Sequence, residues 1–125
     1  MNDNAKKWVE ALRSGRFKQG KGRLWNPTTD EYCCLGVASE LYAAENPEYV
    51  VKSDGNNKHY GFTVEAGGWI GILDPTVSDW LGLAELDGRF SRGGLNPSLA
   101  GLNDQGSSFQ EIADIIESQP DGMFK

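Results

Sequence analysis

Residues 12–37 begin with Leu12-Arg-Ser-Gly-Arg-Phe-Lys-Gln-Gly-Lys-Gly-Arg-Leu-Trp25, turn at Asn26-Pro27 and end with Tyr32-Cys-Cys-Leu-Gly-Val37. The first part is a basic, glycine-rich segment, and Asn-Pro is typical of a turn. The apolar residues that follow Tyr32 predict the start of a helix. The chain therefore carries a basic loop, a short hairpin and two adjacent cysteines in direct succession.

Helices are expected on both sides of this stretch. Apolar residues at helical spacing predict one helix over residues 5–14 and another over residues 35–45. Asp74-Pro75 and Asn96-Pro97 each combine a capping side chain with a proline, a pair that favours the first turn of a helix. We therefore expect two further short helices directly after these pairs.

The last helix has the clearest pattern. A capping box formed by Ser107 or Ser108 with Gln110 or Glu111 predicts its first turn. Its apolar face consists of Phe109, Ile112, Ala113 and Ile116. Together with the preceding segment it resembles the first two helices of a helix-turn-helix, and the matching residues are Leu102, Gly106, Ser108, Glu111, Ile112 and Ala113. Residues 118–125 predict no recognition helix, so sequence-specific DNA binding is not expected.

Strands are expected in the first hairpin and in the middle of the chain. Residues 49–52 and 69–73 predict strands. A further strand is indicated by alternating apolar side chains, namely Tyr60, Phe62 and Val64. The predicted fold class is α+β, with a small, mostly antiparallel sheet packed with about four to five helices in a single domain over residues 1–125.

The composition is that of a folded protein without a membrane span. Hydrophobic residues make up 38% and charged residues 24% of the 125 residues, which is typical of a globular chain. No apolar run approaches the ~20 residues that cross a bilayer, and the N-terminus has no signal-peptide pattern. We therefore expect a cytosolic protein whose two cysteines are reduced thiols.

Charge is unevenly distributed along the chain. The formal net charge is −6, yet residues 1–23 hold seven of the twelve basic side chains and carry +5, against −11 for the remainder. This asymmetry indicates either a local anion site on an acidic body or a basic segment that packs against acidic groups of its own fold. The acidic body argues against broad, non-specific binding of nucleic acid, because that binding requires many phosphate contacts.

The basic loop carries the residue types of a phosphate or nucleotide site. Arginine offers a planar fork and lysine a point charge for phosphate, while aromatic rings stack on a base. The candidate ligand-binding residues are Arg13, Arg16, Phe17, Lys18, Gln19, Lys21, Arg23, Trp25, Asn103 and Asp104. The loop lacks the spacing of a P-loop, and a solvated connection between a helix and a hairpin is the alternative interpretation.

The adjacent residues Cys33 and Cys34 suggest a cysteine nucleophile. A thiol at the start of a helix can have a lowered pKa, and His59 is the one histidine that could act as its base. This order resembles papain-like cysteine hydrolases in outline, although the motifs around their nucleophiles are missing. The alternative, which we favour, is that the cysteines are core residues, because free cysteine is among the most buried residue types.

No metal ion or cofactor is expected. One histidine and two adjacent cysteines do not provide the ligand spacing of a zinc site, and the acidic pattern of a calcium loop is absent. A homo-oligomer is compatible with the sequence, because binding pockets often form between subunits. The sequence alone does not decide between a monomer and an oligomer.

Five motifs, in order along the chain, resemble a group of small phage- and prophage-encoded proteins. They are Trp8-x-x-Ala-Leu-Arg-Ser-Gly15, Gln19-Gly-x-Gly22, Tyr32-Cys-Cys-Leu-Gly-Val37, Trp80-Leu-Gly-Leu83 and Leu102-Asn-Asp-x-Gly-x-Ser-Phe-x-Glu-Ile-Ala113. The resemblance implies a viral accessory protein that acts in the cytosol of a bacterial host. It transfers no activity to particular residues.

These observations lead to three hypotheses for function. The first is a counter-defence protein that sequesters a small anionic ligand, a nucleotide-derived immune signal, without turnover. The second is an acidic inhibitor that binds a host enzyme or mimics nucleic acid. The third is a cysteine-dependent hydrolase. The charge asymmetry favours the first, so we expect no catalytic activity.

Overall fold

The computed structural model describes residues 1–53, 55, 58–61 and 71–125. Its helices are α1 (Asp3–Arg13), α2 (Cys34–Glu45), α3 (Pro75–Leu81), α4 (Leu99–Asp104) and α5 (Phe109–Glu117). Its strands are β1 (Trp25–Asn26), β2 (Glu31–Tyr32), β3 (Val50–Ser53) and β4 (Lys58–Gly61). The predicted α+β class is confirmed within these residues.

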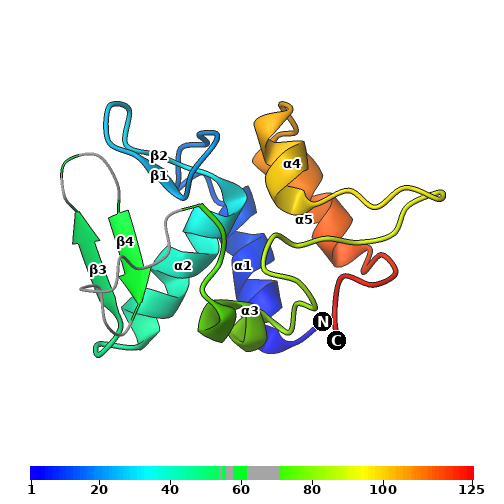
Figure 1. The fold of residues 1–125 in the computed structure, drawn as a ribbon, viewed down its shortest axis with the longest axis horizontal. Helices are drawn as coiled ribbons and strands as arrows, with labels where there is room; N and C mark the ends of the chain where they lie inside the picture. The colour runs from blue at the N-terminus through cyan, green and yellow to red at the C-terminus, as the bar shows by residue number, and fades with distance from the viewer. Residues whose placement is uncertain (54, 56–57, 62–70) are drawn as a thin grey trace.

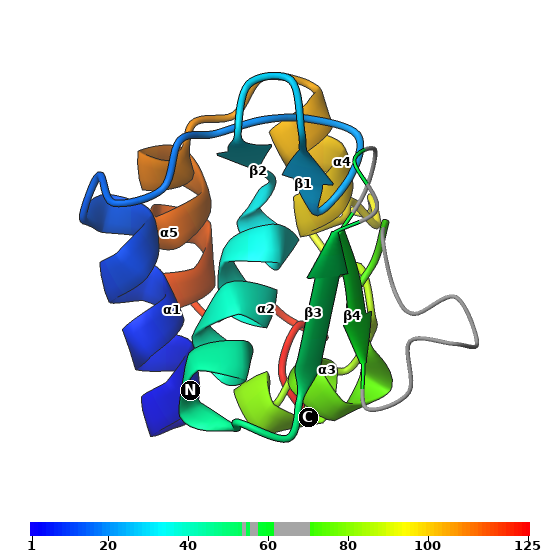
Figure 2. The same ribbon diagram turned by 90° about the vertical axis from the view of Figure 1, so that its left-hand side faces the viewer.

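Helix α2 stands between α1 and the β3–β4 hairpin in both views of the ribbon (Figures 1 and 2). Helix α1 packs against α5 and α2, and α2 also contacts α3 and α4. Both views place the β1–β2 hairpin and α4 at the same end of the molecule. The basic loop crosses this end in Figure 2, where it connects α1 to β1.

Helix α1 forms where the sequence predicted a helix. Asn2 caps it, because its Oδ1 accepts a hydrogen bond from the backbone N of Ala5 at 2.8 Å. The buried face consists of Ala5, Trp8, Val9, Ala11 and Leu12. The fully buried Trp8 donates its Nε1–H to the carbonyl of Cys34 at 2.9 Å. This hydrogen bond ties α1 to the start of α2.

A close backbone contact explains the glycine of the Tyr32-Cys-Cys-Leu-Gly-Val37 motif. A Cβ added to Gly36 would lie 1.9 Å from the carbonyl oxygen of Leu24, a distance that no side chain can occupy. Leu24 is itself fully buried. The first turn of α2 is therefore in direct backbone contact with the segment that leads into β1.

The described strands form two separate antiparallel hairpins. In β1–β2, Trp25 pairs directly with Tyr32. In β3–β4, Val50 pairs with Gly61 at one end and Ser53 with Lys58 at the other. Each hairpin is thus only two strands wide, and its stability depends on packing against the helices.

The strand predictions are confirmed in part. The hairpin around Asn26-Pro27 and the strand over 49–52 are present, within a residue or two of their predicted bounds. The predicted strand over 69–73 is wrong in its described part, because residues 71–73 have no strand structure. Phe62, Val64 and Trp69 lie outside the described residues.

Helix α5 begins at the predicted capping box. Ser108 Oγ accepts from the backbone N of Glu111 at 3.1 Å, and Glu111 Oε1 accepts from the backbone N of Ser108 at 3.0 Å. Helix α4 begins later than predicted. Its cap is Ser98 rather than Asn96, with Ser98 Oγ accepting from the backbone N of Gly101 at 3.0 Å.

The chain after α5 returns to the body of the protein. Residues 118–125 contain no helix, as the sequence predicted. Met123 is fully buried, and its carbonyl accepts a hydrogen bond from the backbone N of Ala84 at 2.9 Å. Within the described part of the chain, no helix is both long and apolar enough to span a membrane.

Candidate anion-binding site

The basic loop, residues 14–24, is anchored through the side chain of Gln19. Its Nε2 donates to Asn103 Oδ1 at 2.9 Å and to the carbonyl of Ser107 at 2.7 Å. Its Oε1 accepts from the backbone N of Phe109 at 3.1 Å. A single side chain therefore connects the loop to α4 and to the first residue of α5.

Asn103 extends this connection into the core. Its side chain is fully buried, and its Nδ2 donates to the carbonyl of Gly20 at 2.7 Å. Its Oδ1 also accepts from the backbone N of Cys34 at 3.2 Å. We call these contacts the Gln19–Asn103 network. Among the described residues, every buried side-chain nitrogen and oxygen has a partner, and a fully satisfied network of this kind rigidifies its surroundings.

Two glycine amides of the loop are also bonded within the protein. Asp104 Oδ1 accepts from the backbone N of Gly22 at 2.8 Å. The backbone N of Gly20 donates to the carbonyl of Tyr32 at 2.7 Å. Since these amides are occupied, contact with an anion falls to the cationic side chains of the loop rather than to these glycines.

The structure brings Gln19, Asn103 and Asp104 together with the basic loop, as the sequence grouped them. Their polar side-chain groups form hydrogen bonds within the protein itself. Their part in holding a ligand stays a prediction, and their observed part is to position the loop.

Three cations project from the loop. Arg16, Lys18 and Lys21 are all exposed. The Nζ of Lys18 lies 3.9 Å from a carboxylate oxygen of Glu31, but the lysine side chain is 70% exposed, so water screens this ion pair strongly. Arg23 is half-buried and has interactions within the protein. Like charges held on one short segment raise the local positive potential, which favours an anion there.

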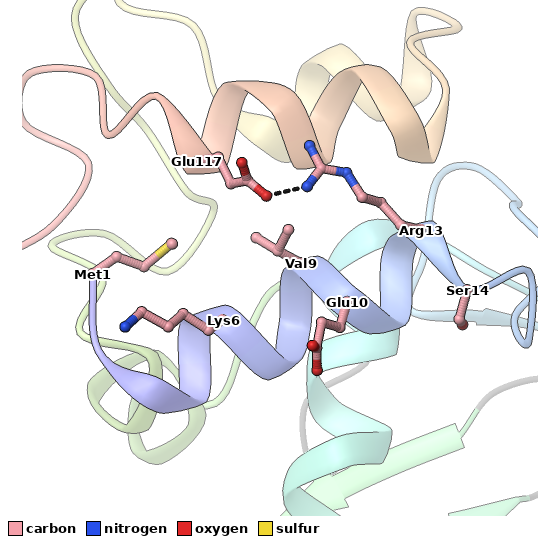
Figure 3. Close-up of a pocket in the computed structure, with 7 residues that line it drawn as sticks. All are labelled: Met1, Lys6, Val9, Glu10, Arg13, Ser14 and Glu117. Atoms are coloured by element: carbon pink, nitrogen blue, oxygen red, sulfur yellow. Dashed lines mark hydrogen bonds and ion pairs between the residues drawn. The ribbon is translucent and has the colours of Figure 1, made fainter.

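Arg13 has a structural partner instead. It lies on α1 and forms ion pairs with Asp114 and Glu117 of α5, the second of which is drawn in Figure 3. Its hydrogen bonds to Asp114, and then to Glu117, raise the pKa of the guanidinium. Because two carboxylates balance its charge, Arg13 links two helices and contributes less to the positive potential than the loop cations do.

The two predicted stacking residues have different surroundings. The ring of Phe17 packs edge-to-face on Tyr32 with centroids 5.5 Å apart, and the guanidinium of Arg16 lies 5.5 Å from its centroid. The ring of Trp25 instead faces the ammonium group of Lys58 at 5.0 Å. Phe17 is therefore the aromatic residue that lies beside the loop cations.

Two open cavities flank α1. The larger has a volume of about 540 Å³ and is lined by Met1, Lys6, Val9, Glu10, Arg13, Ser14 and Glu117 (Figure 3). The smaller, of about 370 Å³, is lined in part by Arg16 and Leu41. Lys18 and Lys21 line neither of these two cavities, so a ligand held by all three loop cations lies on the surface of the loop.

The cysteines are core residues with protonated thiols. Cys33 is 4% exposed and Cys34 is fully buried. Burial raises the pKa of Cys33 to about 11 and raises the pKa of Cys34 well above its ordinary value. The expected effect of the helix start is therefore outweighed by the loss of solvent around the sulfur atoms. At neutral pH almost no thiolate is present.

His59 lies on β4, next to the fully buried Tyr60. Successive side chains of a strand point to opposite faces, so His59 and Tyr60 leave β4 on opposite sides. The hydroxyl of Tyr60 donates to Glu40 Oε1 on α2 at 3.1 Å, which places Tyr60 on the side of β4 that faces α2, the helix that begins at Cys34. The strand therefore does not direct the imidazole of His59 towards Cys33.

The described ranges contain no group of three or more histidine, cysteine or acidic side chains arranged to hold a metal ion.

An ion pair joins β4 to α2 and was not among the residues that the sequence grouped. Lys58 Nζ lies 2.6 Å from Glu40 Oε1. The period-two spacing of Lys58 and Tyr60 is a sequence signal that these side chains share a face of the strand. The partner on α2 is distant in sequence, so only the fold reveals it.

The fold and the loop define a small α+β protein that presents cations on a fixed surface segment. Residues 1–120 match the model of the family described as Domain of unknown function (DUF8296), and the chain belongs to this family. The match includes the basic loop, both cysteines and the Gln19–Asn103 network. No curated protein and no solved structure matches the chain.

Proposed function

We propose that the protein binds a small polyanion, of the class of nucleotide-derived ligands, at the basic loop and releases it unchanged. The observation that carries this proposal is the exposure of Arg16, Lys18 and Lys21 on a loop that the Gln19–Asn103 network holds in place. A loop that is ordered before binding loses little conformational entropy when the ligand arrives.

The residue types favour phosphate as the recognised group. Arg16 can form two parallel hydrogen bonds to one phosphate, and Lys18 and Lys21 can neutralise the charge of a second. Phe17 is half-buried and lies under Arg16, so a base or ribose can cover the part of its ring that solvent reaches. A ligand with at least two phosphates and one aromatic ring matches these groups.

Binding without turnover agrees with the state of the cysteines. A cysteine nucleophile acts as a thiolate, and the raised pKa values of Cys33 and Cys34 keep both thiols protonated at neutral pH. This observation disfavours the cysteine hydrolase hypothesis.

The resemblance to phage- and prophage-encoded proteins supports a biological role for such binding. In this role the protein is a counter-defence factor in the bacterial cytosol that sequesters a nucleotide-derived immune signal. Sequestration requires one binding site per signal molecule and no chemistry. The loop supplies the charge for this task.

A thermal-shift screen with two matched variants tests the proposal. The panel contains ATP, NAD, cyclic dinucleotides, cyclic trinucleotides, cyclic ADP-ribose isomers and pyrophosphate, and each ligand is checked for turnover by chromatography. The site variant carries Arg16→Ala, Lys18→Ala and Lys21→Ala. The control variant loses the same charges elsewhere through Arg92→Ala, Lys6→Ala and Lys52→Ala, all at exposed positions.

We expect at least one ligand to raise the melting temperature of the wild-type protein in a saturable manner, because it binds the folded state preferentially. The control variant should retain this shift and the site variant should lose it, with the ligand recovered unchanged. Equal shifts for the site variant and the wild type would contradict the proposal, as would the absence of a shift with every ligand in the panel.

The second hypothesis has one observation in its favour. Glu111, Asp114 and Glu117 are all exposed along α5, although Arg13 partly neutralises the last two. An inhibitor that uses these carboxylates should bind a basic partner with an affinity that falls as salt rises. Binding that is insensitive to salt would exclude this alternative.

A further inference from the structure

The ammonium group of Lys58 is in contact with side chains from three other elements, β1, β2 and α2. Its Nζ donates to Glu40 Oε1 on α2 at 2.6 Å and to the hydroxyl of Tyr32 on β2 at 2.6 Å. The side chains of Lys58 and Glu40 are only 20% and 21% exposed. This ion pair is therefore much better shielded from water than the surface pairs of the protein.

Aromatic rings complete the surroundings. The ammonium nitrogen lies 5.0 Å from the ring of Trp25 and 4.9 Å from the ring of Tyr32, within the range of a cation–π interaction. Trp25 and Tyr32 pair directly across the β1–β2 hairpin, so both rings stand on the same face. That face of the hairpin is therefore turned towards the ammonium group of Lys58.

Tyr60 positions the carboxylate. It is fully buried, and its hydroxyl donates to Glu40 Oε1 at 3.1 Å. Since Lys58 and Tyr60 are two residues apart on β4, they extend from the same face of the strand. The Glu40 oxygen that accepts the ammonium is thus held by a second hydrogen bond. We call Trp25, Tyr32, Glu40 and Tyr60 the ammonium cage.

We propose that the ammonium cage is a recognition site for a primary alkylammonium group, and that Lys58 occupies it from within the same chain. An incoming ammonium group, either of a free alkylamine such as a polyamine or of a lysine side chain, binds by displacing Lys58. The proposal is independent of the proposed anion site, because it concerns a ligand of opposite charge and does not involve Arg16, Lys18 or Lys21.

The contacts select a primary ammonium among cations. Its three N–H donors match the carboxylate of Glu40 and the hydroxyl of Tyr32, and leave one for water. A quaternary ammonium would keep the attraction to the rings of Trp25 and Tyr32 but has no N–H to donate to either oxygen. The cage should therefore prefer n-butylammonium to tetramethylammonium.

The position of Lys58 makes displacement feasible. It is the first residue of β4 and pairs with Ser53 across a hairpin of two described strands, and two-stranded hairpins are marginal on their own. A group tethered to the same chain competes at an effective concentration on the order of millimolar. Removal of the Lys58 ammonium should therefore strengthen binding of a free alkylammonium.

The test is a titration of three proteins with n-butylammonium, followed by thermal shift and calorimetry. Lys58→Ala opens the cage, and Lys52→Ala removes an exposed lysine of the neighbouring strand as the matched control. We expect Lys58→Ala to bind n-butylammonium about ten-fold more tightly than the wild type or the control. n-Butanol, which has no charge, should give no shift.

A second substitution locates the effect. Glu40→Gln in the Lys58→Ala background should abolish binding of n-butylammonium, because the amide does not balance its charge. Spermidine and a peptide with a single lysine, titrated in parallel, distinguish a free amine from a side chain as the preferred source. Equal affinity of Lys58→Ala and Lys52→Ala for n-butylammonium would overturn the proposal.

A measurement on the wild-type protein covers the case in which Lys58→Ala does not fold. In ¹⁵N–¹H spectra of lysine ammonium groups, the protected signal of Lys58 should disappear as n-butylammonium is added, while the signals of exposed Lys18 and Lys21 stay unchanged. A Lys58 signal that persists at saturating n-butylammonium would overturn the proposal.

Discussion

The Gln19–Asn103 network and the ammonium cage both fix a surface segment to the helices, but they do so by different means. The network uses neutral amides, of which Asn103 is fully buried. The cage uses a charge pair whose side chains are 20% and 21% exposed. A buried amide that loses its partner cannot bond to water, whereas water can replace a partner of Lys58. At Asn103 the network therefore depends on its protein partners, whereas we propose that the occupant of the cage can exchange.

Asn103→Ala should have the largest effect on stability. It leaves the carbonyl of Gly20 and the backbone N of Cys34 without their side-chain partner. It also removes one of the two acceptors of Gln19 Nε2, which keeps the carbonyl of Ser107. We expect a loss of about 3 kcal/mol in the free energy of unfolding, measured by urea denaturation. Asn96→Ala, at an exposed position, is the control and should change it by less than about 0.5 kcal/mol. Equal effects at the two positions would show that the network is not a structural anchor.

Gln19→Ala should cost less, because the half-buried Gln19 leaves a gap that water can enter. We expect a loss of about 2 kcal/mol by the same measurement, and faster hydrogen exchange at the amide of Gly22 in the loosened loop. Gln110→Ala on the exposed side of α5 is the control. If exchange at Gly22 stayed as slow as in the wild type, the loop would have another anchor.

Lys58→Met should cost about 1 kcal/mol at pH 7, since it retains the apolar stem of the side chain and Glu40 keeps its hydrogen bond from Tyr60. Burial lowers the pKa of Lys58, but its hydrogen bonds to Glu40 and Tyr32 outweigh this and leave it raised above 10.5. A raised pKa of the folded state gives stability below the pKa of the unfolded state, and this stability disappears as pH rises through the folded value. The difference in the free energy of unfolding between Lys58→Met and the wild type should thus shrink above pH 10.5. A difference that grew with pH would contradict the raised pKa of Lys58. Lys52→Met is the control.

The last prediction concerns the rate at which the cysteines are alkylated. It involves no substitution, so it has the smallest expected effect on stability. With the pKa of Cys33 near 11, against an ordinary value of 9.0, iodoacetamide should label the folded protein far more slowly at pH 8 than the protein in urea. The stability that this raised pKa provides is complete below pH 9 and is lost towards pH 11. Rapid labelling of the folded protein at pH 8 would return the cysteine to consideration as a nucleophile.

Local patterns accounted for most of the helices. The capping box at Ser108 and the cap-plus-proline pair Asp74-Pro75 specify their helix starts through contacts within four residues, and both are confirmed. Asn96-Pro97 carried the same local signal, yet the cap is Ser98, because the chain first forms an isolated bridge between Arg89 and Ser98. A tertiary contact overrode a local preference at this position.

The site was predictable in part. Arg16, Lys18 and Lys21 are exposed as a loop pattern implies, and the sequence grouped Gln19 with Asn103. The direction of their amides was not predictable, because the hydrogen bonds to Ser107 and Phe109 cross long stretches of chain. The same is true of Cys33, where the helix start argued for a low pKa and only the packing shows that burial prevails.

The most direct test of the central claim is a ¹⁵N–¹H titration of the wild-type protein with ATP and a cyclic dinucleotide, with all backbone amides observed. Ligand-induced shifts should concentrate in residues 14–24, while the bonded amides of Gly20 and Gly22 stay protected from exchange. Shifts centred on the cavity between α1 and α5, or none within residues 14–24, would contradict the assignment of the basic loop as the anion site.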